Sequence, residues 1–166
     1  MKEFLQKAKQ SSRVVATLST AIKNKTLLEF ADAIEENSCF IIEENIKDMK
    51  LARELDLSSA MQDRLYLNDS RIQDMANAIR QIASQTEPVG RVLDGWLTKD
   101  NLNIQKVSIP IGVIAIIYES RPNVTSDTAA LCFKSGNVCV LKGGKEAENS
   151  NRAIAKIIQD VLEKNN

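Results

Sequence analysis

The region from Pro110 to Glu146 constrains the fold most, because two short apolar runs flank a segment with helical character. The runs, Val113–Tyr118 and Val138–Leu141, are rich in Val and Ile and carry no charge. Unbroken runs of this kind are typical of parallel strands with both faces covered. Between them, Val124–Lys134 suits a helix, and Gly136 suits its C-terminal end. The region therefore predicts a strand–helix–strand unit.

Two loops leave the carboxyl ends of these strands, and we expect both at the same edge of the sheet. The first loop, Glu119–Asn123, supplies a guanidinium group, an amide and a helix N-terminus. Asn123 or Thr125 is the expected N-cap of that helix. The second loop, Lys142–Lys145, carries two ammonium groups around a Gly pair that lets a ligand approach the backbone. Together the loops suit an anionic ligand that contains phosphate.

Composition narrows the possible functions. The chain has 166 residues, of which 43% are hydrophobic and 27% charged, as in a globular domain with a real core. Lys plus Arg and Asp plus Glu both number 22, so no basic excess indicates a nucleic-acid partner. The absence of histidine excludes a His-dependent triad or zinc site within the chain. With no secretory signal and no membrane-spanning run, a cytoplasmic location is expected.

The three cysteines are expected to be structural. Cys39, Cys132 and Cys139 have the spacing of neither a metal pair nor a redox C-x-x-C motif. Free cysteine packs as a small hydrophobe, so packing is expected to bury all three thiols. No metal site is predicted.

The first half of the chain is predicted to be helical. Apolar residues recur at helical spacing in three sets, which are Val14, Leu18 and Ile22, then Leu27, Ala31 and Ile34, then Ile41, Ile42, Ile46, Met49 and Leu51. Thr26 and Glu29 have capping-box spacing, which predicts a new helix start there. Asp56–Asp69 is expected to be less regular, with Asn68 among the caps of the next helix. Charges between the apolar positions are expected to form solvated faces.

Two further elements complete the prediction. Gly95–Thr98 and Leu102–Ile109 are predicted strands around the turn at Lys99–Asn101. An amphipathic helix follows the central unit, with Asn149 or Ser150 as its N-cap and Ile154, Ile157, Ile158, Val161 and Leu162 on its apolar face. Two parallel strands alone make a poor sheet with unpaired edges. The chain is therefore expected to be part of a larger protein and to associate when isolated.

Several strings identify a family. I-P-I-G-V-I-A-I-I-Y-E-S-R-P-N-V-T and K-S-G-N-V-C-V-L-K-G-G-K-E-A-E-N-S-N resemble the γ-glutamyl phosphate reductase family of the aldehyde dehydrogenase superfamily. So do A-M-Q-D-R-L from Ala60 and P-V-G-R-V-L-D-G-W from Pro88, and the resemblance covers essentially the whole chain. Family members are much longer, so this chain resembles their N-terminal part.

The resemblance implies an α/β fold in three parts. Residues 1–87 would be the N-terminal helical part of the cofactor domain, and residues 88–110 a hairpin that serves as an oligomerisation arm. Residues 111–166 would begin a Rossmann-like NADP-binding sheet as its first βαβα part. A plain surface hairpin is the alternative for residues 88–110. The catalytic domain is expected outside this chain.

The resemblance also implies a cofactor site, although the chain lacks G-x-G-x-x-G after its first strand. Lys142 matches a strand-end lysine near the adenosine ribose. Many NAD-using members have an acidic residue where this chain has Lys145, which favours NADP(H). Ordinary surface lysines are the alternative. The cofactor-binding residues expected are Tyr118, Ser120, Arg121, Pro122, Lys142, Gly143, Gly144 and Lys145.

Three polar residues have two possible roles each. Asn123 matches the asparagine whose amide stabilises an oxyanion in this superfamily, or it serves as a helix N-cap. Arg121 would hold a phosphate or carboxylate, or pair with Glu119. Arg64 would contact an anionic substrate, or pair with Asp63 or Glu54.

The activity implied is reduction of γ-glutamyl phosphate to glutamate 5-semialdehyde in proline biosynthesis. A cysteine thiolate would displace phosphate, and NADPH would reduce the thioester. That cysteine is expected outside this chain, so the chain alone is expected to be inactive. A homo-oligomer is implied, with the pathway's glutamate kinase as a further possible partner and neither nucleic acid nor membrane. A non-catalytic nucleotide-binding module and a helical interaction protein are the alternatives.

Overall fold

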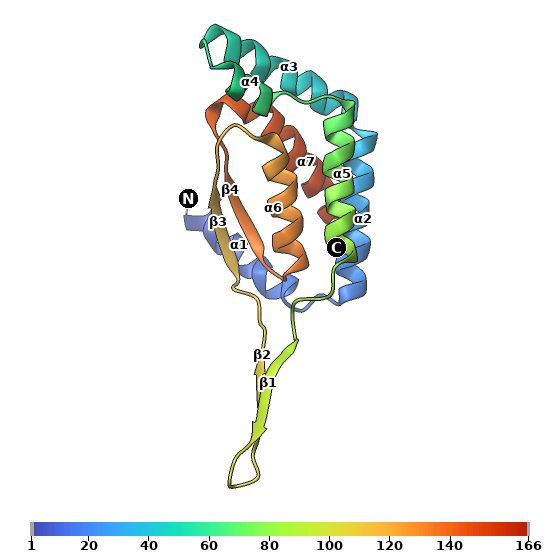
Figure 1. Cartoon of the computed structure of the whole chain (residues 1–166), viewed down its shortest axis with the longest axis vertical. Coiled ribbons are helices and arrows are strands. Elements are labelled where there is room, and N and C mark those ends of the chain that lie inside the picture. The colour runs from blue at the N-terminus through green and yellow to red at the C-terminus, as the bar shows by residue number, and fades with distance from the viewer. Residues whose placement is uncertain (1, 166) are drawn as a thin grey trace.

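The computed structural model describes residues 2–165 and shows a helical body, a small parallel sheet and a projecting hairpin (Figure 1). The elements follow in the order α1 (Lys2–Val15), α2 (Thr20–Glu36), α3 (Ser38–Glu54), α4 (Ser59–Leu65), α5 (Asp69–Ser84), β1 (Val92–Leu97), β2 (Asn103–Val107), β3 (Val113–Ile117), α6 (Pro122–Lys134), β4 (Val138–Lys142), η1 (Lys145–Ala147) and α7 (Glu148–Lys164). The predicted α/β class is confirmed. None of the helices in the described residues is long and apolar enough to cross a membrane.

The central unit forms as predicted. Strands β3 and β4 pair in parallel, from Val113 opposite Val138 to Ile117 opposite Lys142. Gly136 follows α6 with φ +73°, a left-handed conformation that glycine adopts without strain.

The expected burial of both strand faces is wrong for this chain. No residue of β3 or β4 is fully buried, and Ile117 is 84% exposed. Helices α1 and α6 contact the pair, which has no third strand within residues 2–165. Two strands therefore offer more apolar surface than these helices cover.

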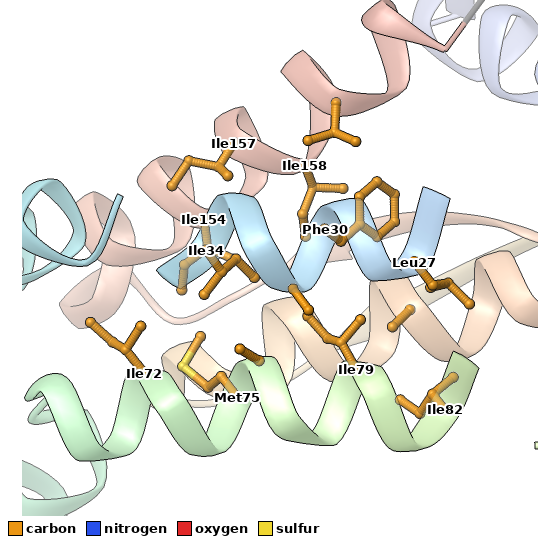
Figure 2. Packing of buried hydrophobic residues seen from close by; sticks show 14 of the residues in the cluster. Leu27, Phe30, Ile34, Ile72, Met75, Ile79, Ile82, Ile154, Ile157 and Ile158 are labelled. Carbon is orange, nitrogen blue, oxygen red and sulfur yellow. The ribbon is translucent and has the colours of Figure 1, made fainter. Parts of the chain in front are cut away.

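The core lies among α2, α5, α6 and α7 (Figure 2). Apolar side chains from α2 and α5 meet those of α7, including Leu27, Phe30, Ile34, Ile72, Met75, Ile79, Ile154, Ile157 and Ile158. The Phe30 and Phe133 rings pack with centroids 5.6 Å apart, which ties α6 to α2. The apolar faces predicted for residues 27–34 and 154–161 are confirmed.

The N-terminal helices differ from the prediction in two places. Ser19 caps α2 by accepting the Ile22 N–H, and the helix continues through Thr26, so the predicted start there is wrong. Val14 and Ile22 are exposed on separate helices and do not form a core face. Thr26 is buried, because packing of α2 on α5 decides its role more than local capping chemistry.

The stretch expected to be irregular contains a short helix. Ser58 caps α4 by accepting the Met61 N–H, and Asn68 caps α5 by accepting the Arg71 N–H. The prediction for Asn68 is confirmed.

The N-terminus of the last helix is capped by a side chain from another helix. Helix α7 begins at Glu148, so neither Asn149 nor Ser150 is its N-cap. The fully buried Asp48 carboxylate on α3 instead accepts the backbone N–H groups of Asn149 and Ser150, at 3.1 and 2.8 Å. It also accepts both of their side-chain donors. A carboxylate at this position stabilises the helix N-terminus.

Two lysines depart from the expected solvated faces. Lys23 and Lys134 are each 2% exposed. The Lys23 ammonium donates to Glu87 and to the Lys134 carbonyl, and the Lys134 ammonium donates to Asn24 and the Ala83 carbonyl. Burial lowers the pKa of Lys134. This network joins α2 and α6 to the segment that leads into the hairpin.

Candidate functional site

The two predicted loops meet at one edge of the sheet. The Tyr118 N–H donates to the Lys142 carbonyl at 3.1 Å, which continues the ladder past the strands. The buried Ser120 hydroxyl donates to the Glu146 carboxylate, and this hydrogen bond lowers the pKa of Glu146. The side chains that leave the carboxyl ends of β3 and β4 therefore lie together, as the strand order predicts.

One cavity, the glycine-loop pocket, opens beside β4 with a volume of about 380 Å³. Its walls include Tyr118, Lys142, Gly143, Gly144, Lys145 and Asn151. A volume of this size is typical of small-molecule sites. The structure thus gathers part of the predicted cofactor set around a single cavity.

A chain of hydrogen bonds shapes the wall of the glycine-loop pocket. The Tyr118 hydroxyl lies 2.6 Å from Thr125 Oγ1, which donates to Asn151 Oδ1 at 2.9 Å. Burial raises the pKa of Tyr118. A Cβ at Gly143 would overlap the Asn151 amide and touch the Tyr118 ring. The Asn151 and Tyr118 side chains therefore pack directly against the Gly143 backbone, and a larger residue there would displace them.

The charge of the glycine-loop pocket is predominantly positive. Arg152 pairs with Glu148 at 2.6 Å, and Glu146 is engaged by Ser120. Lys142 and Lys145 are exposed and have no ion-pair partner within residues 2–165. Two ammonium groups without ion-pair partners in these residues line one cavity, which suits an anion.

The remaining predicted residues lie elsewhere. Ser120 is buried between the loops, and Pro122 is buried at the first position of α6. Arg121 lines a second cavity of about 340 Å³, the Asn123 pocket, which α4 and α5 enclose with the start of α6. Arg64, Arg71, Asp74, Asn123 and Asp127 also line it. Both cavities border the first turns of α6, one beside the two lysines and Thr125 and the other beside Asn123 and Asp127.

Asn123 is not the helix N-cap. Helix α6 begins at Pro122, whose fixed φ suits the first helical position, and Arg121 is the N-cap residue without a side-chain bond. The Asn123 side-chain N–H donates to Asp127 Oδ2 at 3.0 Å. Since the amide carries two N–H bonds, one is left for another acceptor. The predicted N-cap role of Asn123 or Thr125 is wrong.

Asp127 is the residue of this pocket that sequence reasoning missed. Its Oδ1 is buried and has no hydrogen-bond partner among the described residues. Burial raises the pKa of Asp127, although the hydrogen bond from Asn123 opposes this. The sequence signal for the contact is the four-residue separation from Asn123, because side chains four residues apart lie on one face of a helix.

The three arginines of the Asn123 pocket differ in their engagement. Arg71 donates to the Asp63 carboxylate at 2.8 Å and to the Tyr66 carbonyl at 2.8 Å. Arg64 and Arg121 are exposed and make no ion pair with any residue from 2 to 165. The alternatives that paired Arg64 with Asp63 or Glu54, and Arg121 with Glu119, are therefore wrong.

The cysteines divide by environment. Cys132 is buried and Cys139 half-buried, between α6 and β4, but Cys39 is exposed on α3. The expectation that packing buries all three is wrong for Cys39. No cluster of three or more metal-ligating side chains is found in the described part of the chain.

Comparison with known proteins gives consistent matches. The chain is 70% identical over 166 residues to γ-glutamyl phosphate reductase from Aliarcobacter butzleri, covering 100% of this chain and 40% of that protein. It is 62% identical over 165 residues to γ-glutamyl phosphate reductase from Sulfurimonas denitrificans, covering 99% and 40%. The chain therefore spans about two fifths of the length of the curated relatives it matches. No family model matches it.

Solved structures agree with these relatives. The crystal structure of γ-glutamyl phosphate reductase from Thermotoga maritima matches with a TM-score of 0.93 and 42% identity, over 96% of this chain and 38% of that one. The Saccharomyces cerevisiae enzyme matches with a TM-score of 0.90 and 34% identity, over 96% and 40%. An NAD-dependent benzaldehyde dehydrogenase from Corynebacterium glutamicum matches at 0.68 with 20% identity, over 93% and 31%, which shows the fold alone.

Proposed function

We propose, for a chain that belongs to the γ-glutamyl phosphate reductase family, that it forms the cofactor-binding part of an NADPH-dependent reductase. The complete enzyme would convert γ-glutamyl phosphate to glutamate 5-semialdehyde in proline biosynthesis. The main support is the presence of two cavities at the first turns of α6, one lined by lysines without ion-pair partners and one lined by Asn123, whose second amide N–H is free. A cofactor phosphate and a substrate carbonyl need these two environments.

The glycine-loop pocket fits a dinucleotide phosphate. Gly143 and Gly144 line the pocket without side chains of their own, and Lys142 and Lys145 supply positive charge that has no ion-pair partner within residues 2–165. Glu146 accepts from Ser120 and forms no ion pair with Lys145, whose ammonium group would meet a 2′-phosphate. When bound, the nicotinamide cofactor supplies the hydride for the reduction.

Asn123 would stabilise charge that develops on the reacting carbonyl oxygen. Its amide is held by Asp127 through one N–H, and the second N–H remains to donate to an oxyanion. Preorganised donors of this kind strengthen in the transition state, and loss of one typically costs about 10²–10³ in turnover. Neither Cys132 nor Cys139 is assigned as nucleophile, because both pack between α6 and β4.

The hairpin of β1 and β2 projects from the body and exposes Trp96 and Leu97, which suits an arm that contacts a second copy (Figure 1). We assign the enzyme to the cytoplasm, with the glutamate kinase of the same pathway as a partner. Arg121 would lie on the substrate side of the sheet edge, because it lines the Asn123 pocket.

A charge reversal at Lys145 tests the cofactor assignment in the complete enzyme that contains this chain. Lys145→Glu should lower kcat/KM for NADPH by about 10- to 100-fold, because a 2′-phosphate would meet a carboxylate. The value for NADH should change by less than about threefold. Lys156→Glu, in the exposed part of α7, is the matched control. Equal losses with both cofactors would remove Lys145 from the 2′-phosphate site.

A further inference from the structure

We infer that the Asn123 pocket holds the amino-acid end of the substrate, and that the Asp127 carboxylate binds its α-ammonium group. This inference rests on the proposed function, because it assigns an orientation to that substrate. The pocket has a volume of about 340 Å³ and opens between α5 and the first turns of α6. This is enough for a five-carbon amino acid.

The charges of the pocket match those of an amino acid. The α-carbon of a glutamyl compound carries one ammonium and one carboxylate group. Arg64 and Arg121 present guanidinium groups with no ion-pair partner in the described residues, whereas Arg71 is held by Asp63. Guanidinium groups bind carboxylates through paired N–H bonds. A site for the α-carboxylate therefore lies in the same cavity as Asp127.

Asp127 has an unused acceptor where an ammonium group is needed. Its Oδ1 is buried without a partner, while its Oδ2 accepts from Asn123. Leaving a buried carboxylate oxygen unpaired is costly, so native structures usually supply a donor. No side chain of the described residues does so here. Oδ1 is closed to solvent in this conformation, so the carboxyl group would turn it toward the cavity to meet an ammonium group, which has three donors.

The spacing along α6 matches the substrate. Asn123 and Asp127 are four residues apart, which places their Cβ atoms roughly 5–6 Å apart on one helix face. The α-nitrogen and the δ-carbon of an extended glutamyl chain are four bonds apart, or about 5 Å. A substrate bound to Asp127 through its ammonium group would thus present its carbonyl near Asn123. Asp127 would contact the substrate directly and also position the Asn123 amide.

The test compares two aldehydes in the complete enzyme, assayed in the oxidative direction with NADP⁺ and phosphate. Glutamate 5-semialdehyde carries the α-amino group, and 5-oxopentanoate has the same chain without it. Rates are referred to the free open-chain aldehyde, because the amino aldehyde cyclises through its own amine. Asp127→Asn should lower kcat/KM about 100-fold for the amino aldehyde, and less than about threefold for 5-oxopentanoate. Asp160→Asn, on the exposed face of α7, is the matched control.

Each outcome decides the inference. Equal losses for both aldehydes would mean that Asp127 acts only by positioning Asn123. A selective loss with Asp74→Asn in place of Asp127→Asn would move the ammonium site to α5. Either result overturns the assignment of Asp127, provided that the wild-type enzyme is active. A wild-type enzyme that is inactive on both aldehydes would instead overturn the proposed function. Titration with L-glutamate and glutarate repeats the comparison without turnover, and only L-glutamate should bind more weakly to Asp127→Asn.

Discussion

At the scale of single residues, burial makes ionisation of the Asp127 carboxyl costly to the folded state. Burial raises its pKa above the value of an unfolded chain, about 4. For an acid, this means that the folded state resists ionisation, so stability is lost as pH rises from about 4 through the folded pKa. Asp127→Asn keeps the shape and removes the charge. It should therefore raise the thermal midpoint of the complete enzyme at pH 7.5, with a smaller gain at pH 4.5.

Differential scanning calorimetry at the two pH values checks this, with Asp160→Asn expected to leave both midpoints unchanged. A midpoint at pH 7.5 that falls with Asp127→Asn would contradict it. Sequence reasoning reached Asn123 through the resemblance but did not reach Asp127. The contact between them depends on where α6 begins, and the prediction began that helix at Val124, whereas it begins at Pro122. An acidic residue in an amphipathic helix is also indistinguishable from a solvated charge until packing is known.

At the scale of elements, the start of α7 depends on a side chain about a hundred residues earlier. Asp48 is fully buried and accepts from Asn149 and Ser150 through four donors. Hydrogen bonds to a charged group contribute about 1.5–3 kcal/mol each when a partner is removed. Asp48→Ala should therefore destabilise the body by about 3 kcal/mol and speed amide exchange at the start of α7. Exchange measured by mass spectrometry checks this on peptides that cover residues 145–155.

Asp160→Ala, later in the same helix, is the control and should leave exchange at the start of α7 unchanged. Unaltered exchange in Asp48→Ala would show that the backbone donors find other partners. The periodicity of residues 154–162 predicted this helix correctly, because its apolar face is a local property. The N-cap of α7 was predicted wrongly because it depends on a residue far away in the sequence. Asn149 and Ser150 are good caps by composition, but α3 supplies a carboxylate that no local pattern reveals.

At the scale of the whole molecule, the order of helices and strands was predictable from the sequence, but the burial of their apolar faces was not. The apolar runs correctly predicted a parallel pair, but they also predicted strands covered on both faces. Strand β3 remains half-exposed with the surrounding helices in place. Apolar side chains of β3 and of the hairpin remain exposed, and no other element within residues 2–165 covers them. The sequence shows which residues of these strands are apolar, but only the packing of helices and strands shows which of them stay exposed.

The β1–β2 hairpin is expected to mediate self-association. Trp96 and Leu97 are 52% and 70% exposed on an arm that contributes little to the core. In the complete enzyme, Trp96→Ser should weaken self-association about 30-fold or more, since a buried interface tryptophan commonly contributes about 2 kcal/mol or more. Sedimentation velocity across a concentration series measures this, and circular dichroism should show an unchanged fold. Lys99→Ser, in the turn of the same arm, should leave the assembly intact. An assembly equally stable in both variants would reduce the arm to a plain surface hairpin.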